Sequence, residues 1–352
     1  MPIIDFKGAW TALITPFKPD GSVDYSGFEK NIEFQVAGGI TGILPVGTTG
    51  ESPALKEEEH NSVIKKAKEF TMGRCGVLAG TGSNSTLEAL GYCRTAVESG
   101  IDKVLLVDCY YNGPSSLELR REYYQPVLDE YSDIKIVIYV IPGRTGTAIT
   151  PADIAVLSGR YDRVIAIKEA TGDIGRMTEE HSLMPDMSIM SGDDDITFEI
   201  MTNSGIGSAG AISVISNIAP LAVTGMVDAL LSGDREKGKS IADKLKPLFS
   251  IVTVKARSTR VLPDGSKATV EDRFRNPLAI KTAMNGLGIP AGAPRRPLGK
   301  MTPEGIDIVR GALKKVYQES FDIFKPLEEF YGIDIEERLS DNDVWNKMTY
   351  GV

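Results

Sequence analysis

The stretch Arg163-Val164-Ile165-Ala166-Ile167-Lys168-Glu169 decides the fold, because it sets one lysine inside an otherwise apolar strand. Lys168 has the same parity as Val164 and Ala166, so on a strand its side chain points to their face, which is the interior of a closed barrel. A lysine removed from water has a lowered pKa and presents the neutral amine that attacks a carbonyl group. On this stretch alone, a lysine just past the strand end that reaches solvent stays an open alternative.

Short apolar runs like this one recur along the chain. Eight are expected to form strands, and they begin at Thr11, Thr41, Gly76, Lys103, Lys135, Arg163, Ser188 and Gly207. Their starts lie roughly 20 to 35 residues apart, which leaves room for one strand, one helix and two short loops. Helix-start signals such as Thr150-Pro151 lie between the runs. Eight alternating units predict an α/β fold of the (β/α)8 TIM-barrel class rather than an open doubly wound sheet.

Past the eighth run the alternation ends and helical patterns follow. We therefore expect a (β/α)8 barrel carrying the active site at 1–225, a C-terminal helical region at 226–325 and a C-terminal extension at 326–352. Within the C-terminal helical region, two β-rich runs flank the turn Pro263-Asp264-Gly265. This pattern predicts an inserted β-hairpin around 256–273.

The composition excludes several classes of function. Lys and Arg number 39 against 48 Asp and Glu, and the net charge of -9 offers no field that attracts nucleic acid or an anionic membrane. No apolar run approaches the ~20 residues of a membrane span, and the N-terminal residues lack the pattern of a secretory signal, so we expect a cytoplasmic protein. With His60 and His181 as the only histidines, no metal site is predicted, and His60 is expected to be solvated on a charged helix.

Polar residues gather where the predicted strands end, which is where barrel enzymes place their active sites. Gly47-Thr48-Thr49-Gly50 offers backbone N–H groups and two hydroxyls that suit a small carboxylate. Tyr111 and Tyr139 are phenols that can pass protons with Thr48, and Arg144 can present a fork to a second carboxylate. Each feature also has a structural interpretation, as a turn, a packing residue or a surface arginine.

Together the motifs resemble the dihydrodipicolinate synthase family, which also includes N-acetylneuraminate lyase and 2-keto-3-deoxygluconate aldolase. The motifs are GTTGE at Gly47, AGTGSNST at Ala79, YYNGPS at Tyr110, YVIPGRTG at Tyr139, IKEATGD at Ile167 and SGDD at Ser191. The resemblance covers roughly residues 5–250 and resumes at Asn276-Pro277 and Lys281. It implies a lyase of the class I aldolase type, in which Lys168 forms a Schiff base with pyruvate and no cofactor is needed.

The resemblance also implies roles for residues at the other strand ends. It assigns catalysis to Lys168, Tyr139, Thr48 and Tyr111. It assigns substrate binding to Thr49, Arg144, Gly192 and Ile212, of which Gly192 and Ile212 would line the pocket through main-chain atoms. In the family the tyrosine that matches Tyr111 reaches the active site of a neighbouring subunit, so we expect a homo-oligomer, a dimer or a homotetramer.

Arg144 favours the synthase branch, where it would bind the carboxylate of aspartate 4-semialdehyde. The implied reaction condenses pyruvate with this aldehyde to 4-hydroxy-tetrahydrodipicolinate, on the route to diaminopimelate and lysine. Three alternatives remain: a pyruvate-dependent lyase of a 2-keto-3-deoxy sugar acid, a non-enzymatic pyruvate-binding barrel, and a phosphate-binding isomerase hinted at by Gly205 and Gly207. Val140, Cys109, the hairpin and the extension depart from the family pattern and bear on which aldehyde is accepted.

A last expectation concerns regulation. The family's lysine-binding positions at a subunit interface are matched by Ser52, Glu57, His60, Asn84, Glu88 and Tyr110. At one of these positions, Glu57 stands where lysine-sensitive bacterial members often carry histidine. Feedback inhibition by L-lysine is therefore a hypothesis that the sequence leaves open.

Overall fold

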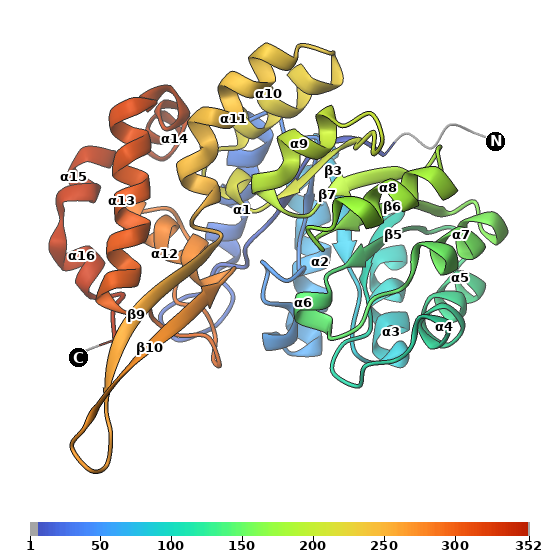
Figure 1. Ribbon diagram of the computed structural model, residues 1–352, viewed down its shortest axis with the longest axis horizontal. Helices are drawn as coiled ribbons and strands as arrows, with labels where there is room; N and C mark the ends of the chain where they lie inside the picture. The colour runs from blue at the N-terminus through green and yellow to red at the C-terminus, as the bar shows by residue number, and fades with distance from the viewer. Residues whose placement is uncertain (1–5, 351–352) are drawn as a thin grey trace.

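A computed structural model of the chain describes residues 6–350. Within this range, eight parallel strands close into a barrel in chain order (Figure 1). The strands are β1 Gly8–Ala12, β2 Gly42–Leu44, β3 Gly76–Gly80, β4 Lys103–Val107, β5 Lys135–Val140, β6 Val164–Glu169, β7 Ser188–Ser191 and β8 Gly210–Ser213. The prediction of a (β/α)8 barrel is confirmed.

The first strand begins earlier than the sequence predicts. The apolar run from Thr11 was expected to be a strand, but β1 ends at Ala12 and the residues beyond it leave the sheet. Leu13 and Ile14 are buried, yet the N–H of Ile14 donates to the side chain of Asn217 at 3.1 Å rather than to a neighbouring strand. The run has strand-like hydrophobicity because loops bury it, and burial alone does not separate a covered loop from a strand.

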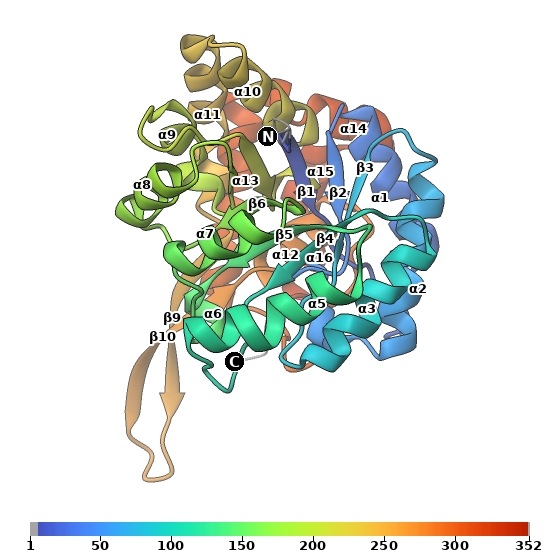
Figure 2. The ribbon, with the colours of Figure 1, turned by 90° about the vertical axis from the view of Figure 1, so that its right-hand side faces the viewer.

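Helices surround the barrel and occupy the connections between its strands (Figure 2). Their bounds are α1 Tyr25–Ala37, α2 Glu57–Thr71, α3 Thr86–Glu98, α4 Ser116–Glu118, α5 Gln125–Glu130, α6 Pro142–Thr145, α7 Pro151–Arg160, α8 Ile174–Leu183, α9 Thr197–Thr202 and α10 Pro220–Leu231. The predicted helix start at Thr150 is confirmed, because its hydroxyl accepts from the N–H of Asp153 and caps α7. None of the helices in the described range has both the length and the apolar character that crossing a bilayer requires.

The C-terminal region packs as helices beside the barrel and carries a projecting hairpin (Figures 1 and 2). Its helices are α11 Arg235–Phe249, α12 Leu278–Leu287, α13 Pro303–Glu319, α14 Lys325–Tyr331, α15 Ile335–Ser340 and α16 Asn342–Asn346. The hairpin pairs β9, Thr253–Val261, with β10, Lys267–Arg275, so it extends beyond the predicted 256–273 at both ends. The division at 225 and 325 stays a prediction, and the predicted segments' outer ends, 1–5 and 351–352, lie outside the described residues.

Trp10 of β1 points into the barrel interior, where its indole ring lies against Gly42 of β2 and Gly76 of β3. A Cβ atom added at Gly42 would lie 2.2 Å from Cζ3 of Trp10, and one added at Gly76 would lie 2.6 Å from its Cη2. Since neither distance is compatible with a real side chain, the two glycines provide the space that the indole ring fills. The absence of side chains at Gly42 and Gly76 on β2 and β3 is therefore matched to the large side chain of Trp10 on β1.

This match predicts that Gly42→Ala destabilises the protein by about 1–3 kcal/mol, because an added methyl group overpacks a rigid site. The measurement is the free energy of unfolding from a denaturant titration. Gly311→Ala is the control, since Gly311 lies in α13 with nothing within 4 Å of the added atom. It should stabilise the protein by up to about 1 kcal/mol through helix propensity. Equal effects of the two substitutions would contradict this account of Trp10.

Candidate active site

Lys168 lies on β6, near the end of the strand that faces the active-site side of the barrel. Its side chain is only 4% exposed, which rules out the alternative of a lysine reaching solvent. Its strand neighbour in register is Tyr139 on β5, and the Lys168 Nζ atom lies 4.3 Å from the centre of the Tyr139 ring. The amine is therefore buried, with one phenol beside it.

A cavity of about 270 Å3 opens above Lys168. Of the residues predicted for the site, it is lined by Lys168, Tyr139, Thr49, Arg144 and Gly192. Thr48 lines two adjoining cavities instead, and its side chain is hydrogen-bonded to Tyr139. The strand ends thus bring together an amine, a phenol, two hydroxyls and a guanidinium.

Burial sets the protonation of the two central groups. It lowers the pKa of the Lys168 amine to about 8, with the carboxylates of Asp193 and Asp194 opposing the shift and Arg144 adding to it. Burial also raises the pKa of the Tyr139 phenol to about 12. Near neutral pH the amine is accordingly much closer to its nucleophilic form than an exposed lysine, whereas Tyr139 keeps the proton that it can donate.

Asn276 links the two residues predicted to bind carboxylates. Its side-chain Nδ2 donates to the Thr49 hydroxyl at 2.9 Å, and its backbone carbonyl accepts from the Arg144 guanidinium at 2.8 Å. No role was predicted for Asn276, although Asn276-Pro277 was part of the family resemblance. No local pattern could have revealed it, because Asn276 lies 227 positions from Thr49 along the chain.

The loop that follows β2 is anchored by a buried ion pair. Glu51, directly after Gly47–Gly50, accepts from Lys281 Nζ of α12 at 2.6 Å and from the N–H of Arg295 at 2.8 Å. The Lys281 amine also donates to the Thr15 carbonyl at 3.0 Å. A buried pair with these additional hydrogen bonds fixes the loop, since removing either partner would leave a charge without compensation.

Three aspartates, Asp193, Asp194 and Asp195, follow β7. A short 3-10 turn, Asp194–Ile196, begins there, and Asp194 is buried. It accepts from the Ser213 hydroxyl and from the N–H of Val214 at 2.9 Å, so it ties the end of β7 to the end of β8. Asp193 instead lines the cavity, and burial raises the pKa of its carboxyl group to about 6.

Besides Thr48, two predicted catalytic or substrate-binding residues do not line the Lys168 cavity of their own chain. Tyr111 is 89% exposed, at a φ of 81°, in the loop after β4. Ile212 is buried on β8 beside Trp10 of β1, and Val214, two residues further on, lines the cavity in its place. Within one chain the proton relay therefore consists of Tyr139 and Thr48 without Tyr111.

A second cavity, of about 800 Å3, lies outside the barrel mouth. It is lined by five of the residues predicted for an effector site, namely Ser52, Glu57, Asn84, Glu88 and Tyr110. His60 lies behind it, with its Nε2 atom 3.1 Å from the Ser52 hydroxyl and its ring 3.9 Å from that of Tyr92.

The expectation of a solvated His60 is wrong. The buried face of α2, which includes Val63 and Ile64, carries the imidazole inward together with these apolar residues. Its burial lowers the pKa of His60 to about 3, so the ring is neutral. The charged residues around it in the sequence occupy the other face of the same helix.

Clusters of side chains that bind metal ions are absent from the described residues. Among residues 6–350, no group of three or more His, Cys, Asp or Glu side chains is arranged to hold a metal ion. The polar groups that line the cavity around Lys168 are hydroxyls, an amide, guanidinium groups and the single carboxylate of Asp193. Such donors suit the oxygens of an organic anion.

Residues 5–316 match the Dihydrodipicolinate synthetase family. The chain belongs to this family. Among curated relatives, the 4-hydroxy-tetrahydrodipicolinate synthase of Methanococcus vannielii is 41% identical over 295 residues, which are 84% of this chain and 93% of that protein. The family resemblance inferred from the motifs is confirmed.

Solved structures of dihydrodipicolinate synthases superpose on most of the chain. The enzyme from Acinetobacter baumannii, chloride inhibited and complexed with pyruvate, has a TM-score of 0.78 at 31% identity and covers 88% of this chain and 98% of its own. The enzyme from Cyanidioschyzon merolae with lysine bound has a TM-score of 0.78 at 29% identity, with the same two coverages. The overall fold of the barrel is thus shared with enzymes of the family.

The setting of Lys168 predicts how its reactivity depends on pH. An amine whose pKa is lowered from 10.5 to about 8 becomes neutral as the pH rises through about 8. Reductive methylation with formaldehyde, followed by peptide mass mapping, should show Lys168 modification with this midpoint. Arg144→Ala should move the midpoint upward, because it removes a positive charge that disfavours the protonated amine. Arg257→Ala, on the exposed hairpin, should leave the midpoint unchanged. A midpoint near 10.5 in the unmodified protein would refute the lowered pKa of Lys168.

Proposed function

We propose that this protein condenses pyruvate with aspartate 4-semialdehyde to form 4-hydroxy-tetrahydrodipicolinate through an imine on Lys168. The observation that carries the proposal is the buried Lys168 amine beside Tyr139, in a cavity that also holds Thr49 and Arg144. The relatives named 4-hydroxy-tetrahydrodipicolinate synthase support the choice of this reaction within the family. The product belongs to the route to diaminopimelate and lysine.

The first half of the reaction uses Lys168 as the nucleophile. Its neutral amine attacks the ketone carbon of pyruvate, and loss of one water molecule gives the imine. The Thr49 hydroxyl, oriented by Asn276, and the backbone N–H groups of Gly47–Gly50 would hold the pyruvate carboxylate. Removal of a proton from the methyl group of bound pyruvate then gives the enamine, which is a carbon nucleophile.

In the second half, the enamine carbon attacks the aldehyde carbon and a carbon–carbon bond forms. The aldehyde oxygen becomes a hydroxyl by taking a proton from Tyr139. Thr48, which is hydrogen-bonded to Tyr139, can then return a proton to the phenol. Arg144 would bind the carboxylate of the aldehyde and orient it towards the enamine. The amino group of the same substrate then attacks the imine carbon, which closes the ring and releases Lys168.

The exposed Tyr111 supports a homo-oligomer. A large aromatic side chain held outward at a left-handed φ of 81° is costly to display to solvent, and a second copy would cover it. We propose that Tyr111 completes the relay of a neighbouring subunit's site. Dimer or tetramer, and the cytoplasmic location, stay predictions.

The test of the imine is reduction with borohydride in the presence of pyruvate. We expect a mass increase on the peptide that contains Lys168 and none in Lys168→Ala. A substrate panel should then show condensation of pyruvate with aspartate 4-semialdehyde and no cleavage of 2-keto-3-deoxy sugar acids, because Arg144 is expected to bind an acceptor carboxylate. The absence of the adduct would remove the proposed function, whereas turnover of sugar acids alone would favour the other branch of the family.

We further propose that the cavity of about 800 Å3 binds L-lysine as an inhibitor. Glu57 and Glu88 line it and suit the ammonium groups of lysine, and the related enzyme from Cyanidioschyzon merolae has lysine bound. Tyr110 lines both this cavity and the one beside Tyr139. A ligand that orders Tyr110 would therefore act on the catalytic side as well.

This proposal predicts that millimolar L-lysine lowers the activity. Glu88→Gln should raise the concentration needed for half inhibition by roughly tenfold, since it removes one charged hydrogen-bond acceptor. Glu98→Gln is the matched control, because Glu98 lies exposed on the same helix α3 and does not line the cavity. An activity that stays constant up to millimolar L-lysine would reject the effector site.

A further inference from the structure

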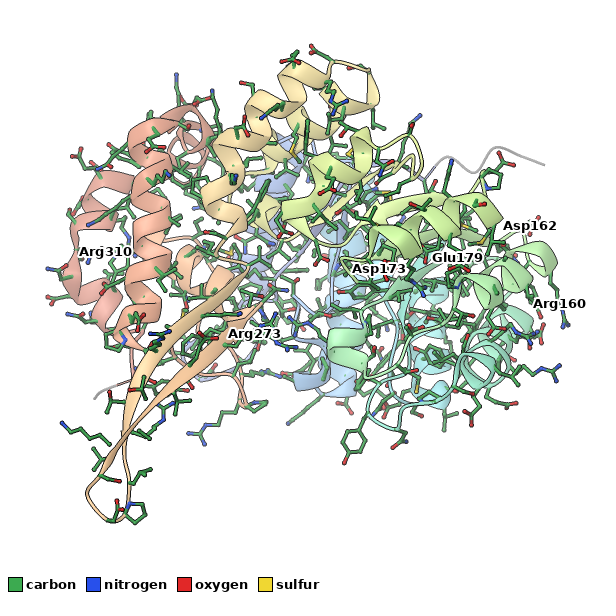
Figure 3. All side chains as sticks on the ribbon, in the orientation of Figure 1. Arg160, Asp162, Asp173, Glu179, Arg273 and Arg310 are labelled. Atoms are coloured by element: carbon green, nitrogen blue, oxygen red, sulfur yellow. The ribbon has the colours of Figure 1, made fainter. Side chains whose placement is uncertain are left out.

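The hairpin delivers two arginines to the active-site cavity. Side chains alternate along β10, so Arg273 and Arg275 share one face of the strand and Phe274 takes the other. Phe274 packs towards α13, where a Cβ atom added at Gly305 would lie 3.3 Å from its ring. Arg273 lies at the base of the hairpin, where the strands meet the body of the molecule (Figure 3). Both arginines line the cavity of about 270 Å3 that contains Lys168.

The same two arginines line a neighbouring cavity of about 500 Å3. Arg144 also borders both spaces, and the larger one adds Arg296 and Lys300. Basic side chains thus extend from the reactive amine outward, in a protein whose net charge is -9. We call Arg144, Arg273 and Arg275 the arginine cluster.

The three positive charges of the arginine cluster have few carboxylates near them. Within residues 6–350, the Arg273 side chain has no hydrogen bond or ion pair, and Arg275 donates only to the Gly143 carbonyl at 2.7 Å. The carboxylate that lines the smaller cavity is Asp193, and in the larger cavity the carboxylate of Glu51 is already bonded to Lys281.

The members of the cluster also repel one another. The pKa of the Arg144 guanidinium is lowered by burial and, further, by the positive charges of Arg275 and Arg273. Like charges brought together in a partly desolvated space cost free energy, and an anion bound among them offsets this cost.

The hairpin is held firmly where the arginines lie. Its strands pair in nine residue positions, from Thr253 with Arg275 to Val261 with Lys267. The Arg257 N–H donates to the Glu304 carboxylate of α13 at 2.8 Å, which joins the hairpin to the helical region. Arg275 directly precedes Asn276, so the base of the hairpin continues into the residue that orients Thr49 and Arg144.

We infer that Arg273 and Arg275 act with Arg144 to bind the carboxylate of the incoming aldehyde, and that the hairpin selects acceptors whose far end is anionic. The inference rests on the proposed function, because it concerns the second substrate of that reaction. Pyruvate would be held by Thr49 and the loop after β2. The cluster therefore acts on the acceptor and leaves imine formation to Lys168.

Steady-state kinetics of Arg273→Ala test the inference. The KM for aspartate 4-semialdehyde should rise about fivefold, the effect of losing one partly screened charge contact, and the KM for pyruvate should stay within about twofold. Arg273→Lys should restore part of the affinity. Arg257→Ala is the matched control, because Arg257 lies on the same hairpin, is exposed and lines neither cavity. Raising the salt concentration should weaken aldehyde binding more in the unmodified protein than in Arg273→Ala.

Two further measurements separate this inference from the proposed function. Borohydride trapping with pyruvate should give the same Lys168 adduct in Arg273→Ala as in the unmodified protein. Calorimetric titration with succinate, an unreactive dicarboxylate, should show about fivefold weaker binding to Arg273→Ala than to the unmodified protein or Arg257→Ala. Equal succinate affinities, or an unchanged KM for the aldehyde, overturn the arginine assignment whether or not the adduct forms. A missing adduct in the unmodified protein overturns the imine alone.

Discussion

The desolvation of one amine is the constraint on which the rest of the site depends. A lysine that is 4% exposed keeps a usable neutral fraction near pH 8 because the barrel withholds water from it. Asp193 and Asp194 oppose this effect, so the position of Asp194 matters. Its hydrogen bonds to Ser213 and Val214 draw its charge towards β8 and compensate it there. The strand ends thus hold the carboxylates close enough to shape the cavity without converting Lys168 fully into an ammonium.

Much of the fold was predictable because the barrel repeats one pattern. All eight strands overlap the expected apolar runs, and the first run extends past the end of β1 because loops bury Leu13 and Ile14 as completely as a sheet would. His60 was misjudged for a similar reason, since its charged neighbours in sequence lie on the other face of α2. Periodicity identifies which elements exist, whereas burial at their edges depends on what packs there.

The site was predictable where it lies on strand ends and less so where it depends on distant chain segments. Lys168, Tyr139, Thr49 and Arg144 follow from strand parity and from the family motifs. Asn276, Arg273 and Arg275 did not, because the contact of β10 with the barrel mouth is set by how the C-terminal helices pack and not by any local motif. Tyr111 is a second case in which a local motif does not determine where the side chain lies. Its motif is present, but within one chain the Tyr111 side chain stays exposed and away from the cavity.

The continuity from Arg275 into Asn276 has an evolutionary consequence. The proposed nucleophile, Lys168, belongs to the barrel, while the hairpin between α11 and α12, which we predict to be an insertion, contributes to the space in which the proposed second reactant would sit. Mutations or length changes in that insertion can retune which electrophile is accepted while the nucleophile stays intact. A scaffold divided in this way lets a lineage explore new carbon–carbon bond-forming partners without passing through inactive ancestors.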